Sequence, residues 1–178
     1  MSAGTEGIDT HVLDGQLTIA SGADIYIADS IRYGHHDADG NLQTAYLNGD
    51  SHTDAYIPND AYAGDSVLGL IAMSDIEYTG YLPDHTEINA TLLAKNGQIR
   101  VEDTRVDGSG TSYTTGSGFR KKGLRRLGSL ISNQRPVSTF IDASNAVTHG
   151  FVFSKSVFDR SQQERPPLGF PTVARPVE

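Results

Sequence analysis

The sequence predicts an all-β protein, a parallel β-solenoid with inserted loops. The main indication is a sequence motif that occurs four times: an apolar run, a small residue, a short polar corner and a second apolar run. The small residues are Ala20, Ala72, Ala94 and Ser132, at intervals of 52, 22 and 38 residues. Such repetition is typical of solenoids, because each coil buries its apolar side only against the next coil. A β-sandwich whose strands look alike by chance is the alternative.

Composition supports the all-β class and a single domain spanning residues 1–178. Nineteen glycines separate many short apolar runs, which favours frequent turns between strands. The chain has no cysteine, so disulfide frameworks and thiolate metal sites are excluded. No apolar stretch approaches the ~20 residues of a membrane helix.

The copies predict which side chains stack on one another between residues 17 and 153. Inward residues of a solenoid lie about 4.8 Å from their equivalents one coil away. One expected ladder contains Ile25, Ile76, Ile99 and Val137, and the other contains Ile19, Ile71, Leu93 and Ile131. The four small residues should mark a corner where a larger side chain does not fit.

Two polar stretches and the C-terminal end interrupt this pattern. We expect insertions at residues 34–66, packed on the surface by tyrosines, and at residues 104–123. Residues 164–178 should form an extended tail over an open end of the solenoid, because their prolines lack the N–H that a central strand donates. The polar lead-in, residues 1–11, is expected to cover an open end as well.

Five segments occur in an order that resembles a known family. They are residues 24–27, 67–72, 88–97, 127–131 and 166–171. Their succession is similar to the β-solenoid region of type IV pilus-associated, minor pilin-like surface proteins of bacteria (the PilX/ComZ-like proteins). The resemblance implies a right-handed parallel β-helix displayed outside the cell. Two departures are the missing apolar N-terminal helix of pilins and the 34–66 insertion.

The first candidate site is a calcium loop at Asp37, Asp39 and Asn41. Calcium takes six to eight oxygen ligands, and alternating Asp and Asn around a glycine turn supply several. A bidentate acid at the usual spacing is missing. Asp-rich turns also arise without metal, because Asp and Asn hydrogen-bond to their own backbone.

The second candidate is a run of five cations that could bind DNA phosphates: Arg120, Lys121, Lys122, Arg125 and Arg126. We expect this run to lie outside the ladders. The chain carries a net charge of −8, which opposes DNA binding, so any such binding must be local and salt-dependent. The alternative is a solvated edge that prevents end-to-end pairing.

The third candidate is catalytic, since parallel β-helices include polysaccharide-acting enzymes. The residues concerned are Asp75, Glu77, Arg100, Glu102 and Asp103. Glu77, Arg100 and Glu102 alternate with ladder residues and should point outward, where a row of surface ion pairs is the simpler interpretation. We therefore assign no catalytic residue and expect no enzyme.

The sequence thus predicts a non-catalytic surface or adhesion module of a type IV pilus-associated protein, outside the cell and part of a longer secreted chain. Its expected partners are other pilus or surface proteins. A DNA-binding module in DNA uptake and a β-helix enzyme acting on polysaccharides are the alternatives. No cofactor is expected apart from the calcium alternative.

Overall fold

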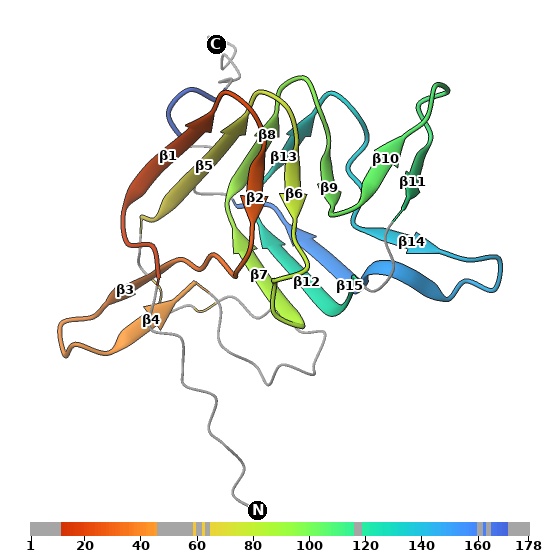
Figure 1. Cartoon of the computed structure of the whole chain (residues 1–178). Helices are drawn as coiled ribbons and strands as arrows, with labels where there is room; N and C mark the ends of the chain where they lie inside the picture. The colour runs from red at the N-terminus through yellow and green to blue at the C-terminus, as the bar shows by residue number, and fades with distance from the viewer. Residues whose placement is uncertain are drawn as a thin grey trace, which may run out of the picture.

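The computed structural model describes residues 12–45, 59, 62, 65–115, 119–159, 162 and 165–170. Within these ranges the chain is built mainly from three parallel sheets (Figure 1). The first sheet has the strand order β1 (Gln16–Ser21), β5 (Val67–Ala72), β8 (Thr91–Ala94) and β13 (Leu130–Ser132). The second has the order β2 (Ile25–Ile27), β6 (Ile76–Tyr78) and β9 (Ile99–Val101). The predicted all-β class with parallel strand pairing is confirmed.

The third sheet completes each pass of the chain. Its parallel strands are β7 (His85–Asn89), β12 (Arg120–Leu127) and β15 (Val147–Val157). The short strand β14 (Thr139–Ile141) pairs antiparallel with β15 at its edge. Single bridges extend the pattern, joining Ile31 to Ile88 and Arg100 to Val137. The chain therefore visits the first, second and third sheet in the same order on successive passes.

The first predicted ladder is correct for three of its four members. Ile25 lies opposite Ile76, and Ile76 lies opposite Ile99. Ile76 and Ile99 are fully buried, as stacked aliphatic side chains between two neighbouring strands should be. Val137, the fourth predicted member, bridges Arg100 and not Ile99, so its predicted place in the ladder is wrong by one residue.

The second predicted ladder was wrong about which face is buried. Ile71, Leu93 and Ile131 are aligned, but they point away from the interior, and Ile131 is 40% exposed. The buried column is one residue earlier, with Leu70 opposite both Ile19 and Leu92. Because strand side chains alternate between faces, a shift of one residue exchanges the inner and outer sets.

The predicted column of small residues is present, but one of its four members is a different residue from the one predicted. Ala72, Ala94 and Ser132 are aligned, and both alanines are fully buried. Ser21 rather than Ala20 is aligned with Ala72. The corner between Ser21 and Ile25 is one residue shorter than the predicted corner between Ala20 and Ile25. The predicted alignment of the first copy is therefore displaced by one residue.

A polar ladder follows this column at the corner between the first and second sheets. The backbone N–H of Asp75 donates to Asp24 Oδ1 at 2.9 Å, and the N–H of Gln98 donates to Asp75 Oδ1 at 2.7 Å. Each corner side chain thus accepts the N–H of its equivalent on the next pass, which satisfies backbone donors that the turn removes from the sheets.

Both expected insertions contain hairpins, and the second is shorter than expected. The hairpins are β3 (Gly34–His36) with β4 (Leu42–Thr44), and β10 (Thr104–Val106) with β11 (Ser112–Thr114). Tyr62 packs against the core from the first insertion, whereas Tyr46 and Tyr56 lie outside the described residues. The second insertion ends before Arg120, where β12 begins.

The C-terminal segment lies on the outer face of the first sheet, which corrects the expected position over an open end. A Cβ added to Gly69 would be 2.4 Å from Phe170 Cε2 and 2.7 Å from Pro167 Cβ. The neighbouring strand contributes a hydrogen bond between Thr91 Oγ1 and Gln162 Oε1. This cover explains why Gly69 and Thr91, on the outer face of the first sheet, are buried. The lead-in, residues 1–11, and residues 171–178 lie outside the described residues.

Candidate functional site

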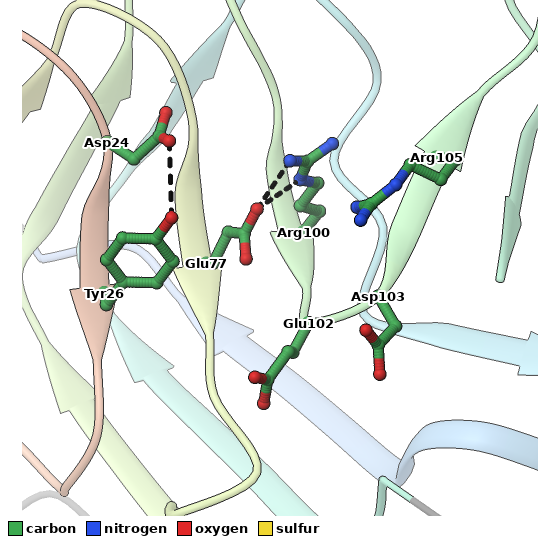
Figure 2. A pocket seen from close by; sticks show the side chains of 7 residues that line it. All are labelled: Asp24, Tyr26, Glu77, Arg100, Glu102, Asp103 and Arg105. Carbon is green, nitrogen blue, oxygen red and sulfur yellow. Dashed lines mark hydrogen bonds and ion pairs between the residues drawn. The ribbon is translucent and has the colours of Figure 1, made fainter. Parts of the chain in front are cut away.

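An open hollow of about 500 Å³ lies on the outer face of the second sheet (Figure 2). Side chains alternate between the two faces along β2, β6 and β9. The residues that point inward belong to the interior, and the polar and aromatic residues between them point outward and line the hollow. The hollow is lined by Asp24, Tyr26, Glu77, Arg100, Glu102, Asp103 and Arg105. Tyr26, Glu77 and Arg100 occupy one row across the three strands, because Tyr26 is paired with Glu77 and Glu77 with Arg100.

Arg100 is the centre of the charge network in this hollow. Its Nε donates to Glu77 Oε1 at 3.0 Å, and its Nη2 also contacts that oxygen. The same Nη2 lies 2.8 Å from Asp75 Oδ2. Glu77 is only 7% exposed, and a carboxylate so far removed from water requires a partner of opposite charge. Figure 2 shows the Arg100 and Glu77 side chains directed toward each other.

Glu102 and Asp103 form the rim at the end of β9. Glu102 does not continue the ion-pair row that we expected, because its Oε2 accepts the backbone N–H of Gly80 at 2.5 Å. Asp103 has a positive φ of 62°, a conformation in which Asn and Asp are enriched among residues with a side chain. This turn leads directly into β10, which brings Arg105 to the same hollow.

Tyr26 supplies the apolar surface of the hollow and is 62% exposed. Its hydroxyl donates to Asp24 Oδ2 at 3.4 Å. The negative charges of Glu77 and Asp24 raise the pKa of Tyr26 above its ordinary value of 10.0. These charges favour the protonated phenol, which is the hydrogen-bond donor in the contact with Asp24.

Four of the five residues considered for catalysis line this hollow, and the fifth, Asp75, lies beside it as a partner of Arg100. The catalytic candidates from the sequence did not include Asp24, Tyr26 or Arg105. A signal for Tyr26 was available: it stands between Ile25 and Ile27, so inward isoleucines predict an outward tyrosine.

The calcium candidates form a hairpin turn between β3 and β4. Asp37 Oδ1 accepts the backbone N–H groups of Asp39 and Asn41, and its Oδ2 accepts the Gln43 Nε2 donor at 3.0 Å. Among the described residues no group of three or more His, Asp or Glu side chains is arranged to hold a metal ion. The turn chemistry accounts for these residues without a metal, and calcium binding itself stays a prediction.

The five cations of the basic run all belong to β12 of the third sheet, so they lie outside both predicted ladders, which belong to the first and second sheets. Adjacent residues of a strand point to opposite faces, so Lys121 and Lys122 are separated, as are Arg125 and Arg126. Lys122 Nζ lies 3.1 Å from Asp84 Oδ2. Arg126 donates to the hydroxyls of Ser154 and Ser156 on the neighbouring strand β15. The structure therefore does not gather the run on one face.

No membrane-spanning helix is found among the described residues, since none is both long and apolar enough. Comparisons with protein-family models, with curated proteins and with solved structures found no match. The pilin-like resemblance accordingly stays a prediction from its motifs.

Proposed function

We propose that this chain is a non-catalytic binding module, built as a right-handed parallel β-helix, that adheres to a hydroxyl-rich glycan through the hollow on its second sheet. Three parallel sheets built from successive passes of the chain support the β-helix assignment. Its right hand follows from the strong preference of parallel crossovers in a sheet.

The exposed ring of Tyr26 beside fixed polar groups is the observation that carries the proposal. The ring stands 62% exposed on a strand, where an aromatic face can pack against the C–H face of a sugar. Carboxylate oxygens beside it accept hydrogen bonds from hydroxyl groups, and guanidinium groups donate them. Because these groups are held by strands, little ordering cost accompanies binding.

The charge of the hollow favours a neutral glycan. Four carboxylates, those of Asp24, Glu77, Glu102 and Asp103, face two guanidinium groups, leaving a formal charge of −2. An excess of negative charge repels uronic acid or sulfated chains. A neutral or amino-bearing polysaccharide is therefore the expected ligand.

The hydrogen-bond partners of the carboxylates favour binding over turnover. Glu77 and Asp75 share Arg100, and Glu102 accepts the Gly80 N–H. A general acid or base needs an oxygen within reach of the substrate proton. The contacts fix the carboxylates of Glu77, Asp75 and Glu102 against other groups of the chain, and their remaining lone pairs can accept hydrogen bonds from a bound glycan. A polysaccharide-acting enzyme at the same hollow is the competing function.

The test is binding to a panel of neutral, amino-bearing and acidic polysaccharides, followed by assay for released reducing ends. We expect binding to neutral or amino-bearing chains without product. Tyr26→Ala should weaken this binding about tenfold, since losing an aromatic contact costs on the order of 1.4 kcal/mol.

Phe158→Ala is the matched control, because Phe158 is a half-exposed aromatic residue (50%) that does not line the hollow. Its binding should equal that of the unchanged chain. Release of oligosaccharides would favour the enzyme instead. A failure of the unchanged chain to bind any polysaccharide in the panel would refute the proposal.

The cellular location and the parent protein of this module are proposed from the sequence resemblance alone. On that basis we propose a bacterial cell-surface location within a type IV pilus-associated protein, with other pilus or surface proteins as partners. The glycan proposal rests on the hollow and does not depend on this setting.

A further inference from the structure

The parallel stack has two unpaired ends within the described residues. β1 is the outer strand of the first sheet at one end and pairs only with β5, while β13 is the outer strand at the other end and pairs only with β8. Figure 1 shows these strands at opposite sides of the sheet. An outer strand presents backbone N–H and C=O groups that another strand can pair with.

The edge at β1 leaves inward-facing apolar side chains uncovered. Leu17 and Ile19 are 45% and 46% exposed, whereas their register partners Leu68 and Leu70 are each 4% exposed. The difference arises because β5 has a neighbouring strand on both sides and β1 has only one. A further strand beside β1 would bury this surface in the same way.

The residues of β13 have the same pattern as the residues of β5 that already pair with β1. In the observed pairing, Ile19, Ala20 and Ser21 lie opposite Leu70, Ile71 and Ala72. The residues of β13 repeat that order of two aliphatic residues and one small residue: Leu130, Ile131 and Ser132. β13 also aligns these three with Leu92, Leu93 and Ala94 of β8. The two edges are thus complementary in register, and both belong to one parallel sheet.

The two ends also differ in charge. Residues 12–45, at the β1 end, contain five carboxylates and one cation, whereas residues 130–159, the last pass at the β13 end, contain two cations and two carboxylates. The β1 end of one copy therefore meets no excess of like charge when it contacts the β13 end of another. Two β1 ends would instead bring like charges together, which disfavours a symmetric dimer through this edge.

We propose that copies of this chain associate head to tail, with β13 of one copy pairing parallel with β1 of the next. Leu130, Ile131 and Ser132 of the first copy then lie opposite Ile19, Ala20 and Ser21 of the second. A contact between two different surfaces leaves one free edge on each side, so the assembly is open and grows into short filaments.

The test is sedimentation velocity of the full chain over a wide concentration range at low salt. The average mass of the unchanged chain should rise with concentration beyond that of a dimer. Ile19→Lys removes the β1 contact and Ile131→Lys removes the β13 contact, so each variant alone should be monomeric. An equal mixture of the two variants should form dimers and nothing larger, because one intact edge remains on each partner.

Leu168→Lys is the matched control, since Leu168 is an 83% exposed apolar residue outside both edges, and it should assemble like the unchanged chain. Circular dichroism checks that each variant is folded, and Leu17→Lys replaces Ile19→Lys if the latter is not. A monomeric unchanged chain at every concentration would overturn the proposal, since the β1 edge would then be satisfied within one copy. Dimers formed by Ile131→Lys alone would also overturn it, because they require a symmetric contact.

Discussion

Three aspartates hold three hairpin turns with the same set of hydrogen bonds. Asp37, Asp107 and Asp142 each accept, through Oδ1, the backbone N–H groups two and four residues later. The residue three positions later has a positive φ in each turn, at Gly40, Gly110 and Asn145. Glycine and asparagine tolerate this conformation. The same aspartate-capped turn therefore occurs in all three hairpins.

We predict that the pKa of the Asp107 carboxyl is lower in the folded chain than its ordinary value of 3.8, because the Ser109 hydroxyl and the N–H of Thr111 donate to the charged form. Such a group stabilises the fold above its unfolded pKa, and that contribution disappears as pH falls through the folded pKa. Carboxyl chemical shifts followed by NMR through an acid titration measure this. An equal value in urea-unfolded chain would contradict the prediction.

Gly128 illustrates a position where only glycine fits. Its φ is +136°, and an added Cβ would lie 2.1 Å from the carbonyl oxygen of Ala90. Gly128→Ala should therefore lower the free energy of unfolding by on the order of 3 kcal/mol, measured by urea denaturation. Gly22→Ala is the control, since an added Cβ there has no atom within 4 Å. Equal stability of the two variants would show that the turn at Gly128 relaxes.

At the scale of a strand, alternation decides which aliphatic residues stabilise the fold. In β8, Leu92 is fully buried, whereas its neighbour Leu93 is half-buried on the outer face. The sequence pattern predicts Leu93 in the interior, and the structure shows that this is wrong. The correct register follows from pairing with β5, where Leu70 lies opposite Leu92.

We therefore predict that Leu92→Ala costs about 3 kcal/mol of unfolding free energy, because it leaves a cavity between stacked strands. Leu93→Ala should cost less than about 1 kcal/mol, since its side chain is still partly in water. Urea denaturation of both variants measures the difference. Equal losses would mean that the outer face is as closely packed as the interior.

At the scale of the whole molecule, the net charge of −8 and the distribution of the β12 cations oppose binding of nucleic acid. Lys122 has a carboxylate partner in Asp84, and neighbouring cations of the strand point to opposite faces. The run is therefore divided between the two faces of β12, with Lys121 and Arg125 on the face opposite to Arg120, Lys122 and Arg126.

We predict that the chain does not shift labelled duplex DNA in a gel assay at low salt, even at high protein concentration. The same assay on a variant with Asp84→Asn serves as a comparison, because it frees Lys122 from its partner. DNA uptake would regain support from a shift whose log–log salt slope is about −3 to −4.5, the value for roughly three to five neutralised phosphates.

The sequence alone determined the strand class, the parallel pairing and most of the small-residue column, because these follow from local patterns repeated along the chain. It did not determine the inner face of the first sheet, since a slip of one residue from Ser21 to Ala20 is invisible locally but exchanges the buried and exposed sets. It also did not show that the charged run at Arg120–Leu127 is a strand, because two flanking strands supply the pairing.

The complete lining of the hollow depended on tertiary structure, although four of its seven residues are already candidates from the sequence: Glu77, Arg100, Glu102 and Asp103. Tyr26, Glu77 and Arg100 are separated by 51 and 23 residues along the chain, and only the stacking of β2, β6 and β9 places them in one row. Local patterns decide whether a side chain points inward or outward. Which outward side chains become neighbours depends on the register between passes, and that register is set by packing across the whole stack.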